Sequence, residues 1–179
     1  MTWEDQFRVM KRWYYRLQGT ERGSRNFFTS KETYLEDYFR SFFISCYQLK
    51  DWLKHDRPDL SGEVEECVNK SFALQLAGDI CTFSKHAEIT KTTRTGDRNT
   101  RGVGQMYGVF PKDGSQHYVV SLFKIESGGK EYDAFKVVQE CMDAWGRFLI
   151  SKSLPIPELM EELMLKNFPT WQPAKKETF

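Results

Sequence analysis

The chain has 179 residues, and its 26 basic and 25 acidic side chains leave a net charge of +1. This near-balance excludes a global electrostatic field that would attract nucleic acid or a membrane, so any such partner must bind a local patch. The length fits one domain, and 14 Phe, 8 Tyr and 5 Trp residues supply a real core. No segment approaches the ~18 apolar residues of a membrane span, and the N-terminus lacks a signal-peptide pattern. Four widely spaced cysteines indicate reduced thiols, so we expect a cytoplasmic protein that does not contact a membrane.

The first half of the sequence has the periodicity of helices. Apolar residues at a spacing of three to four predict an amphipathic helix over residues 2–18, which residues 19–23 end. Ser30 can cap a long helix that runs to about His55, and its apolar stripe is broad enough for a central helix with neighbours on several sides. Pro58 breaks it and Ser61 can cap the next helix, which either continues into residues 72–89 or bends near residues 69–71.

Helical periodicity is lost after Ile89. Strands are predicted at residues 106–110, 117–125 and 130–132, with turns at Asp113-Gly114 and at Gly128-Gly129. Asp133 can cap a last long helix. We therefore predict a mostly α fold: a helical bundle over residues 1–168 with an antiparallel β-hairpin or meander inserted at about 103–132, and a flexible tail over residues 169–179. The predicted core residues are Trp52, Phe72, Leu76, Ile80, Phe83, Met142, Trp145 and Leu149.

Polar residues interrupt the apolar segment 72–89. Asp79 and His86 are seven residues apart, so they project from one helical face, and Lys85 precedes His86. A carboxylate can orient a histidine as a general acid or base, and a lysine can hold a phosphate, so these three residues are catalytic candidates, with Asp51 as a further member. Alternatively, Asp79 and Asp51 satisfy Lys85, His86 or an indole in a structural network.

A basic loop, residues 91–104, follows directly. Lys91, Arg94, Arg98 and Arg101 stand against a single acidic residue, Asp97, and three glycines allow close approach of the backbone to a ligand. Arginines on a loop suit contacts with phosphate, so these four basic residues are candidate ligands of RNA or a nucleotide. The alternative is a solvated loop whose charge only maintains solubility.

Other chemistries have weaker support. Phe27, Phe28, Tyr34, Tyr38 and Trp52 could stack on bases, but their helical spacing favours core packing. The cysteine and histidine spacings fit neither a zinc site nor a Cys81 nucleophile. Phosphate-loop and dinucleotide-binding patterns are missing, so the sequence indicates no metal and no cofactor.

The segments FFISCYQLKDWLKHD and SFALQLAGDICTFSKH resemble the paired helices of bacterial helical-bundle proteins of the HEPN type. The resemblance covers residues 34–89 and the last long helix, residues 134–151. Nuclease members use an Arg four to six residues before a His, at an active site formed by a dimer. Here Ile80, Cys81 and Thr82 occupy those positions, and His86 alone matches.

The resemblance therefore implies three functions. The first is a HEPN-like domain without the nuclease arginine, in which the basic loop binds a phosphate-bearing partner, RNA or a nucleotide, or a protein. The second is a HEPN-like ribonuclease that uses His86. The third is a protein-interaction module of a toxin–antitoxin or phage-related system. A homodimer is compatible with each of them.

Overall fold

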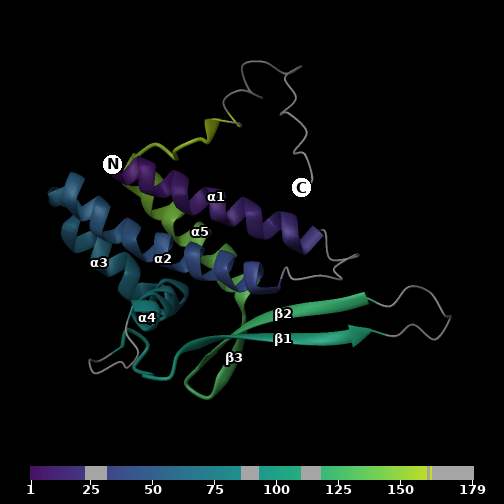
Figure 1. Ribbon diagram of the computed structural model, residues 1–179. Coiled ribbons are helices and arrows are strands. Elements are labelled where there is room, and N and C mark those ends of the chain that lie inside the picture. The colour runs from purple at the N-terminus through teal and green to yellow at the C-terminus, as the bar shows by residue number, and fades with distance from the viewer. Residues whose placement is uncertain (23–31, 86–92, 110–117, 161, 163–179) are drawn as a thin grey trace.

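The computed structural model describes residues 1–22, 32–85, 93–109, 118–160 and 162. Four helices come first: α1 (Trp3–Arg22), α2 (Glu32–Asp56), α3 (Ser61–Lys70) and α4 (Phe72–Lys85). Three strands follow, β1 (Arg101–Val109), β2 (Tyr118–Ser127) and β3 (Lys130–Asp133), and then the helix α5 (Ala134–Ser151). The predicted fold class, a mostly helical bundle with a small antiparallel meander, is confirmed (Figure 1).

Helix α2 is the centre of the bundle, as its broad apolar stripe predicts. It packs against α1, α3, α4 and α5, and its Phe39, Phe42, Phe43, Cys46, Leu49 and Leu53 are fully buried. Helix α5 closes the bundle with Trp145, which is fully buried and whose indole Nε1 donates to the Cys46 carbonyl oxygen at 3.2 Å. The buried indole therefore has the polar partner that its N–H requires.

The chain between α2 and α4 turns twice, and each turn has its own local cause. Pro58 starts a 3₁₀ turn, Pro58–Leu60, that runs directly into α3. Ser61 consequently has helical dihedrals and is the first residue of α3, so its predicted role as N-cap is wrong; Leu60 occupies that position without a side-chain cap. At Ser71 the backbone becomes extended, and its Oγ accepts from the Leu74 N–H at 3.3 Å. The helix therefore bends here, one of the two predicted alternatives.

The sheet has the order β1-β2-β3, with both neighbouring pairs antiparallel. Strands β1 and β2 pair without interruption from Arg101↔Glu126 to Val109↔Tyr118. Gly128 and Gly129, both at positive φ, make the predicted tight turn to β3. The predicted Asp113-Gly114 turn lies outside the described residues.

Asp133 caps α5 as predicted. Its carboxylate accepts from the N–H groups of Phe135 at 2.9 Å and Lys136 at 3.3 Å. These bonds satisfy two of the donors that the first turn of a helix leaves unpaired.

A stacked pair of aromatic rings helps attach the sheet to the bundle. The ring of Phe123 stacks on that of Phe39, with centroids 4.5 Å apart and planes within 8°. On the sheet, a Cβ at Gly102 would lie 2.7 Å from Phe123 Cζ, so only glycine leaves room for the ring. Beyond this contact the β1–β2 ribbon extends away from the helices (Figure 1).

The prediction of core positions is wrong for two residues. Phe72 and Phe83 are 44% and 46% exposed. Of the others, Trp52 and Met142 are partly buried against the core, and Leu76, Ile80, Trp145 and Leu149 are buried. Among the described helices, none combines the length and apolarity needed to cross a membrane.

Candidate functional site

Asp79 is 1% exposed and binds the backbone of the basic loop. One carboxylate oxygen accepts from the Arg94 N–H at 2.6 Å. The other accepts from the Thr95 N–H at 2.9 Å and from the Thr95 hydroxyl at 2.5 Å. A buried carboxylate is costly unless it is fully hydrogen-bonded, and these three donors meet that requirement. The acidic residue in the apolar helix therefore anchors the loop.

A chain of hydroxyl groups continues from this anchor to the sheet. The Thr95 hydroxyl lies 3.3 Å from that of Thr100, which lies 2.7 Å from the Ser127 hydroxyl at the end of β2. Thr100 is fully buried and Ser127 is 3% exposed. The loop is thus joined to both α4 and β2, and the bond between Thr100 and Ser127 is shielded from water, where such bonds are strong.

Asp97 makes a second attachment at the turn between β2 and β3. Its carboxylate accepts from the Asn99 N–H at 2.9 Å and from the Gly128 N–H at 2.7 Å. These backbone hydrogen bonds lower the pKa of Asp97 below its ordinary value. The single acidic residue of the basic loop is therefore engaged with backbone donors.

Arg94 is held on the inner side of the loop by three polar groups. Its guanidinium donates to the Tyr47 hydroxyl at 2.9 Å, to Asn69 Oδ1 at 2.8 Å and to a Glu65 carboxylate oxygen at 3.0 Å. Helix α4 makes this possible at Gly78, where a Cβ would lie 2.6 Å from the Tyr47 ring. Arg94 thus links α2, α3 and the loop, and its donors are largely used within the protein.

Glu65 is surrounded by cations. Lys54 lies 2.8 Å and Lys50 3.6 Å from one carboxylate oxygen, while Arg94 binds the other. Partial burial raises the pKa of Glu65, but the hydrogen bonds from Lys54 and Arg94 and the charge of Lys50 outweigh it and lower that pKa to about 2. Glu65 is therefore ionised at any physiological pH and keeps Arg94 in place.

The other two described arginines of the loop lie on its outer side. Arg98 is exposed, and no described residue forms an ion pair with it. Arg101 is also exposed, and its guanidinium binds Glu126 on β2 at 2.9 Å. Arg98 and Arg101 are thus the loop arginines that a partner in solution can reach.

The remaining predicted site residues fall into two groups. Lys85 is the last residue of α4, whereas His86 and Lys91 lie outside the described residues. Asp51 is exposed on α2 and pairs with Lys50 at 3.2 Å, and no described bond joins it to Asp79. The structural alternative for Asp79 named Lys85, His86 or an indole as its partners, but its described partners are Arg94 and Thr95 of the loop.

The described residues show no arrangement that supports a metal site or a cysteine nucleophile. No group of metal-ligating side chains gathers among the residues that the structure places. All four cysteines are in described segments and none forms a disulfide, and Cys81 is buried. Of the aromatic candidates, Tyr38 and Trp52 pack partly buried against the core, while Phe27 and Phe28 are not in the described part of the chain.

Sequence reasoning missed the residues that hold the loop in place. Four come from other elements and two from the loop itself: Tyr47, Glu65, Asn69 and Ser127, and Thr95 and Thr100. One signal was available. An aspartate in an apolar helix requires donors, and a Thr- and Gly-rich loop shortly after it supplies unpaired backbone N–H groups. The remaining partners come from distant positions, which no local spacing connects.

Comparison with known proteins adds no relative. The chain matches no protein-family model, no curated protein and no solved structure. The geometry of the basic loop therefore carries the functional argument by itself.

Proposed function

We propose that this chain is a HEPN-like domain that binds RNA through the phosphate backbone, with the basic loop as the contact surface. In this proposal Arg98 and Arg101 contact phosphates, and Arg94 holds the loop in place. The observation that carries it is the anchoring of the loop by the buried Asp79, which fixes the backbone from which two exposed arginines project.

Fixing the loop in advance favours binding. A flexible segment loses conformational freedom when it binds, and a segment already held by hydrogen bonds avoids much of that cost. Guanidinium groups form paired, charge-assisted hydrogen bonds to phosphate oxygens. Because the whole chain is nearly neutral, we expect a moderate affinity that depends on a few contacts and falls with salt.

The exposure of the two arginines supports a polymer over a free nucleotide. A small ligand is normally held in a concave site that covers most of its surface. Arg98 and Arg101 instead lie at the protein surface, where successive phosphates of a strand can approach. Lys91 and His86 come shortly before these residues in sequence and are further candidates for the same contact.

The test is fluorescence anisotropy with a labelled RNA of about 12 nucleotides at about 50 mM and about 200 mM salt. We expect the Arg98→Ala/Arg101→Ala double variant to bind at least about tenfold more weakly, with the salt slope reduced by about 0.7 per arginine. Arg12→Ala, which removes an exposed arginine of α1, is the matched control and should bind as wild type.

Three results would contradict the proposal. The first is equal binding by the double variant, and the second is a mononucleotide that competes as well as the RNA. The third is no RNA binding combined with a co-purifying protein, which would favour the interaction module. RNA recovered after incubation should be intact; cleavage that His86→Ala abolishes would instead assign the ribonuclease function.

A further inference from the structure

Two exposed aromatic side chains of α4 lie before and after the residue that anchors the loop. Phe72 and Phe83 are eleven residues apart on α4, which returns them to nearly the same face, and Asp79 lies on that face between them. We call this surface the α4 outer face. Because Asp79 binds the N–H groups of Arg94 and Thr95, the loop contacts α4 at a position that lies between Phe72 and Phe83 along the helix.

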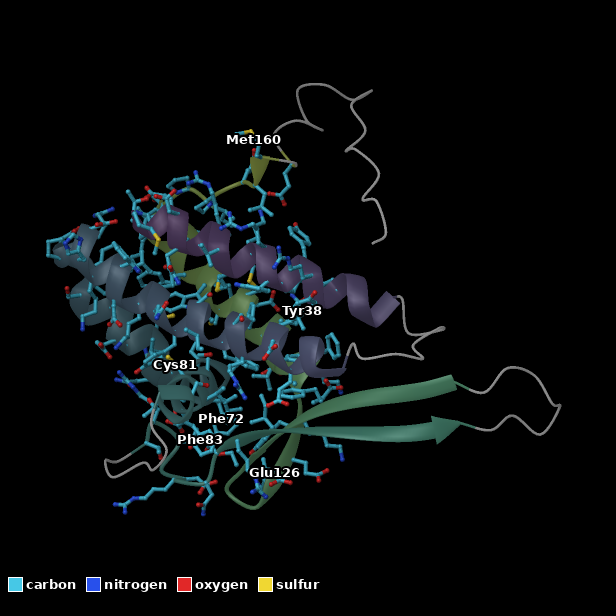
Figure 2. All side chains as sticks on the ribbon, viewed as in Figure 1. Tyr38, Phe72, Cys81, Phe83, Glu126 and Met160 are labelled. Atoms are coloured by element: carbon cyan, nitrogen blue, oxygen red, sulfur yellow. The ribbon has the colours of Figure 1, made fainter. Side chains whose placement is uncertain are left out.

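Both rings are about half exposed, and one of them packs against the sheet. Phe72 is 44% exposed, and its ring lies 5.2 Å from that of Tyr132 on β3. Phe83 is 46% exposed and follows Asp79 by one helical turn. Figure 2 views α4 close to end-on and shows both side chains on the side of the helix that faces the sheet. These two rings present apolar faces to solvent beside an arginine-bearing loop.

We propose that Phe72 and Phe83 stack on unpaired bases, so that the RNA bound by the basic loop is single-stranded. This inference rests on the proposed function, which supplies the phosphate contacts of Arg98 and Arg101. An alternation of exposed aromatic rings with arginines is the arrangement that binds single strands: the cations follow the backbone and the rings take the bases.

The chemistry of the surface selects one occupant. A purely apolar partner would leave Arg98 without a counter-charge, whereas a nucleic acid strand satisfies both the arginines and the rings. A duplex offers phosphates to the arginines but keeps its bases stacked within the helix, out of reach of Phe72 and Phe83. The two rings are ~16 Å apart along α4, so a single strand can contact both across the loop.

The experiment compares a labelled single-stranded RNA of about 12 nucleotides with the duplex of the same sequence. We expect wild type to bind the single strand at least about tenfold more tightly. Phe72→Leu/Phe83→Leu should weaken single-strand binding about tenfold or more and leave duplex binding unchanged, because leucine keeps the apolar volume but loses the aromatic face. Phe72→Tyr/Phe83→Tyr should restore binding.

Ile150→Ala is the matched control, since it removes an exposed apolar side chain on α5 and should change neither affinity. Equal binding of both RNAs, or a Leu variant that binds as wild type while Arg98→Ala/Arg101→Ala is impaired, overturns the stacking inference and leaves the proposed function standing. Binding of neither RNA by wild type overturns both. Circular dichroism of each variant separates lost binding from lost folding.

Discussion

The inner and outer sides of the basic loop use the same residue type for different purposes. On the inner side, Arg94 binds Tyr47, Asn69 and Glu65 and is part of the packing between helices. On the outer side, Arg98 is exposed and has no ion-pair partner among the described residues. The difference teaches that a cluster of arginines in a sequence is not automatically a binding surface, since some of them build the loop that displays the others.

The largest effect is expected at the inner anchor. Asp79→Ala leaves two backbone N–H groups and the Thr95 hydroxyl without their acceptor, so we expect the free energy of unfolding to fall by about 3 kcal/mol or more. Asp79→Asn keeps one acceptor oxygen and should lose clearly less. Urea unfolding measures both; a loss below about 1 kcal/mol for the alanine variant would show that the loop does not depend on this carboxylate.

A second prediction compares two helical glycines, one with a close neighbouring side chain and one without. Gly78→Ala places a Cβ 2.6 Å from the Tyr47 ring and should destabilise the protein by about 1–3 kcal/mol, because the ring and its bond to Arg94 must move. Gly146→Ala meets no atom within 4 Å and should stabilise α5 by about 0.5–1 kcal/mol. Thermal unfolding should show shifts of opposite sign, and equal shifts would refute the role of Gly78.

The third prediction concerns pH. The pKa of Glu65 is lowered from 4.5 to about 2 in the folded protein, so its contribution to stability is complete above pH 4.5 and is lost as the pH falls through about 2. After allowance for solvent screening we expect this contribution to be about 1 kcal/mol. Glu65→Gln should therefore flatten the acid limb of the stability profile. If wild type and Glu65→Gln differed in free energy of unfolding by the same amount at pH 2 and at pH 6, Glu65 would not be the titrating group.

The smallest effect is expected on the outer side. Arg98→Ala should change the free energy of unfolding by less than about 0.5 kcal/mol, and Arg101→Ala, which loses one exposed ion pair with Glu126, by less than about 1 kcal/mol. The inner arginine is the comparison: Arg94→Ala should cost more than either, because it removes three hydrogen bonds at once, to Tyr47, Asn69 and one carboxylate oxygen of Glu65. Chemical denaturation of the three variants side by side would show whether this order holds.

The fold was predictable from the sequence where local rules decide the structure. Apolar periodicity located the helices and the central position of α2, and Asp133 and the Gly128-Gly129 turn were readable from residue type alone. The N-cap prediction for Ser61 failed, because the 3₁₀ turn before it leads directly into α3 and Ser61 already has helical dihedrals. Periodicity places Phe72 and Phe83 in the core, because it identifies an apolar face of a helix but not what covers that face.

The candidate site was only partly predictable for the same reason. Asp79 was recognisable as a polar residue that must have a purpose, and the basic loop as a group of cations. Their direct contact was not readable, since it depends on how the loop returns onto α4 after residue 92. Nor could the sequence separate Arg94 from Arg98, because their difference is made by Tyr47, Asn69 and Glu65, which are 25 to 47 residues from Arg94 in the chain.

The hydrogen bond between Trp145 and the Cys46 carbonyl has a consequence for folding during synthesis. The two residues are separated by 99 positions, and the whole sheet is synthesised between them. During translation, the face of α2 that Trp145 covers stays uncovered until α5 has been synthesised. The bundle of the nascent chain is therefore incomplete while the β-strands emerge. Completion of the last helix is therefore the step at which we expect the emerging chain to become resistant to proteases.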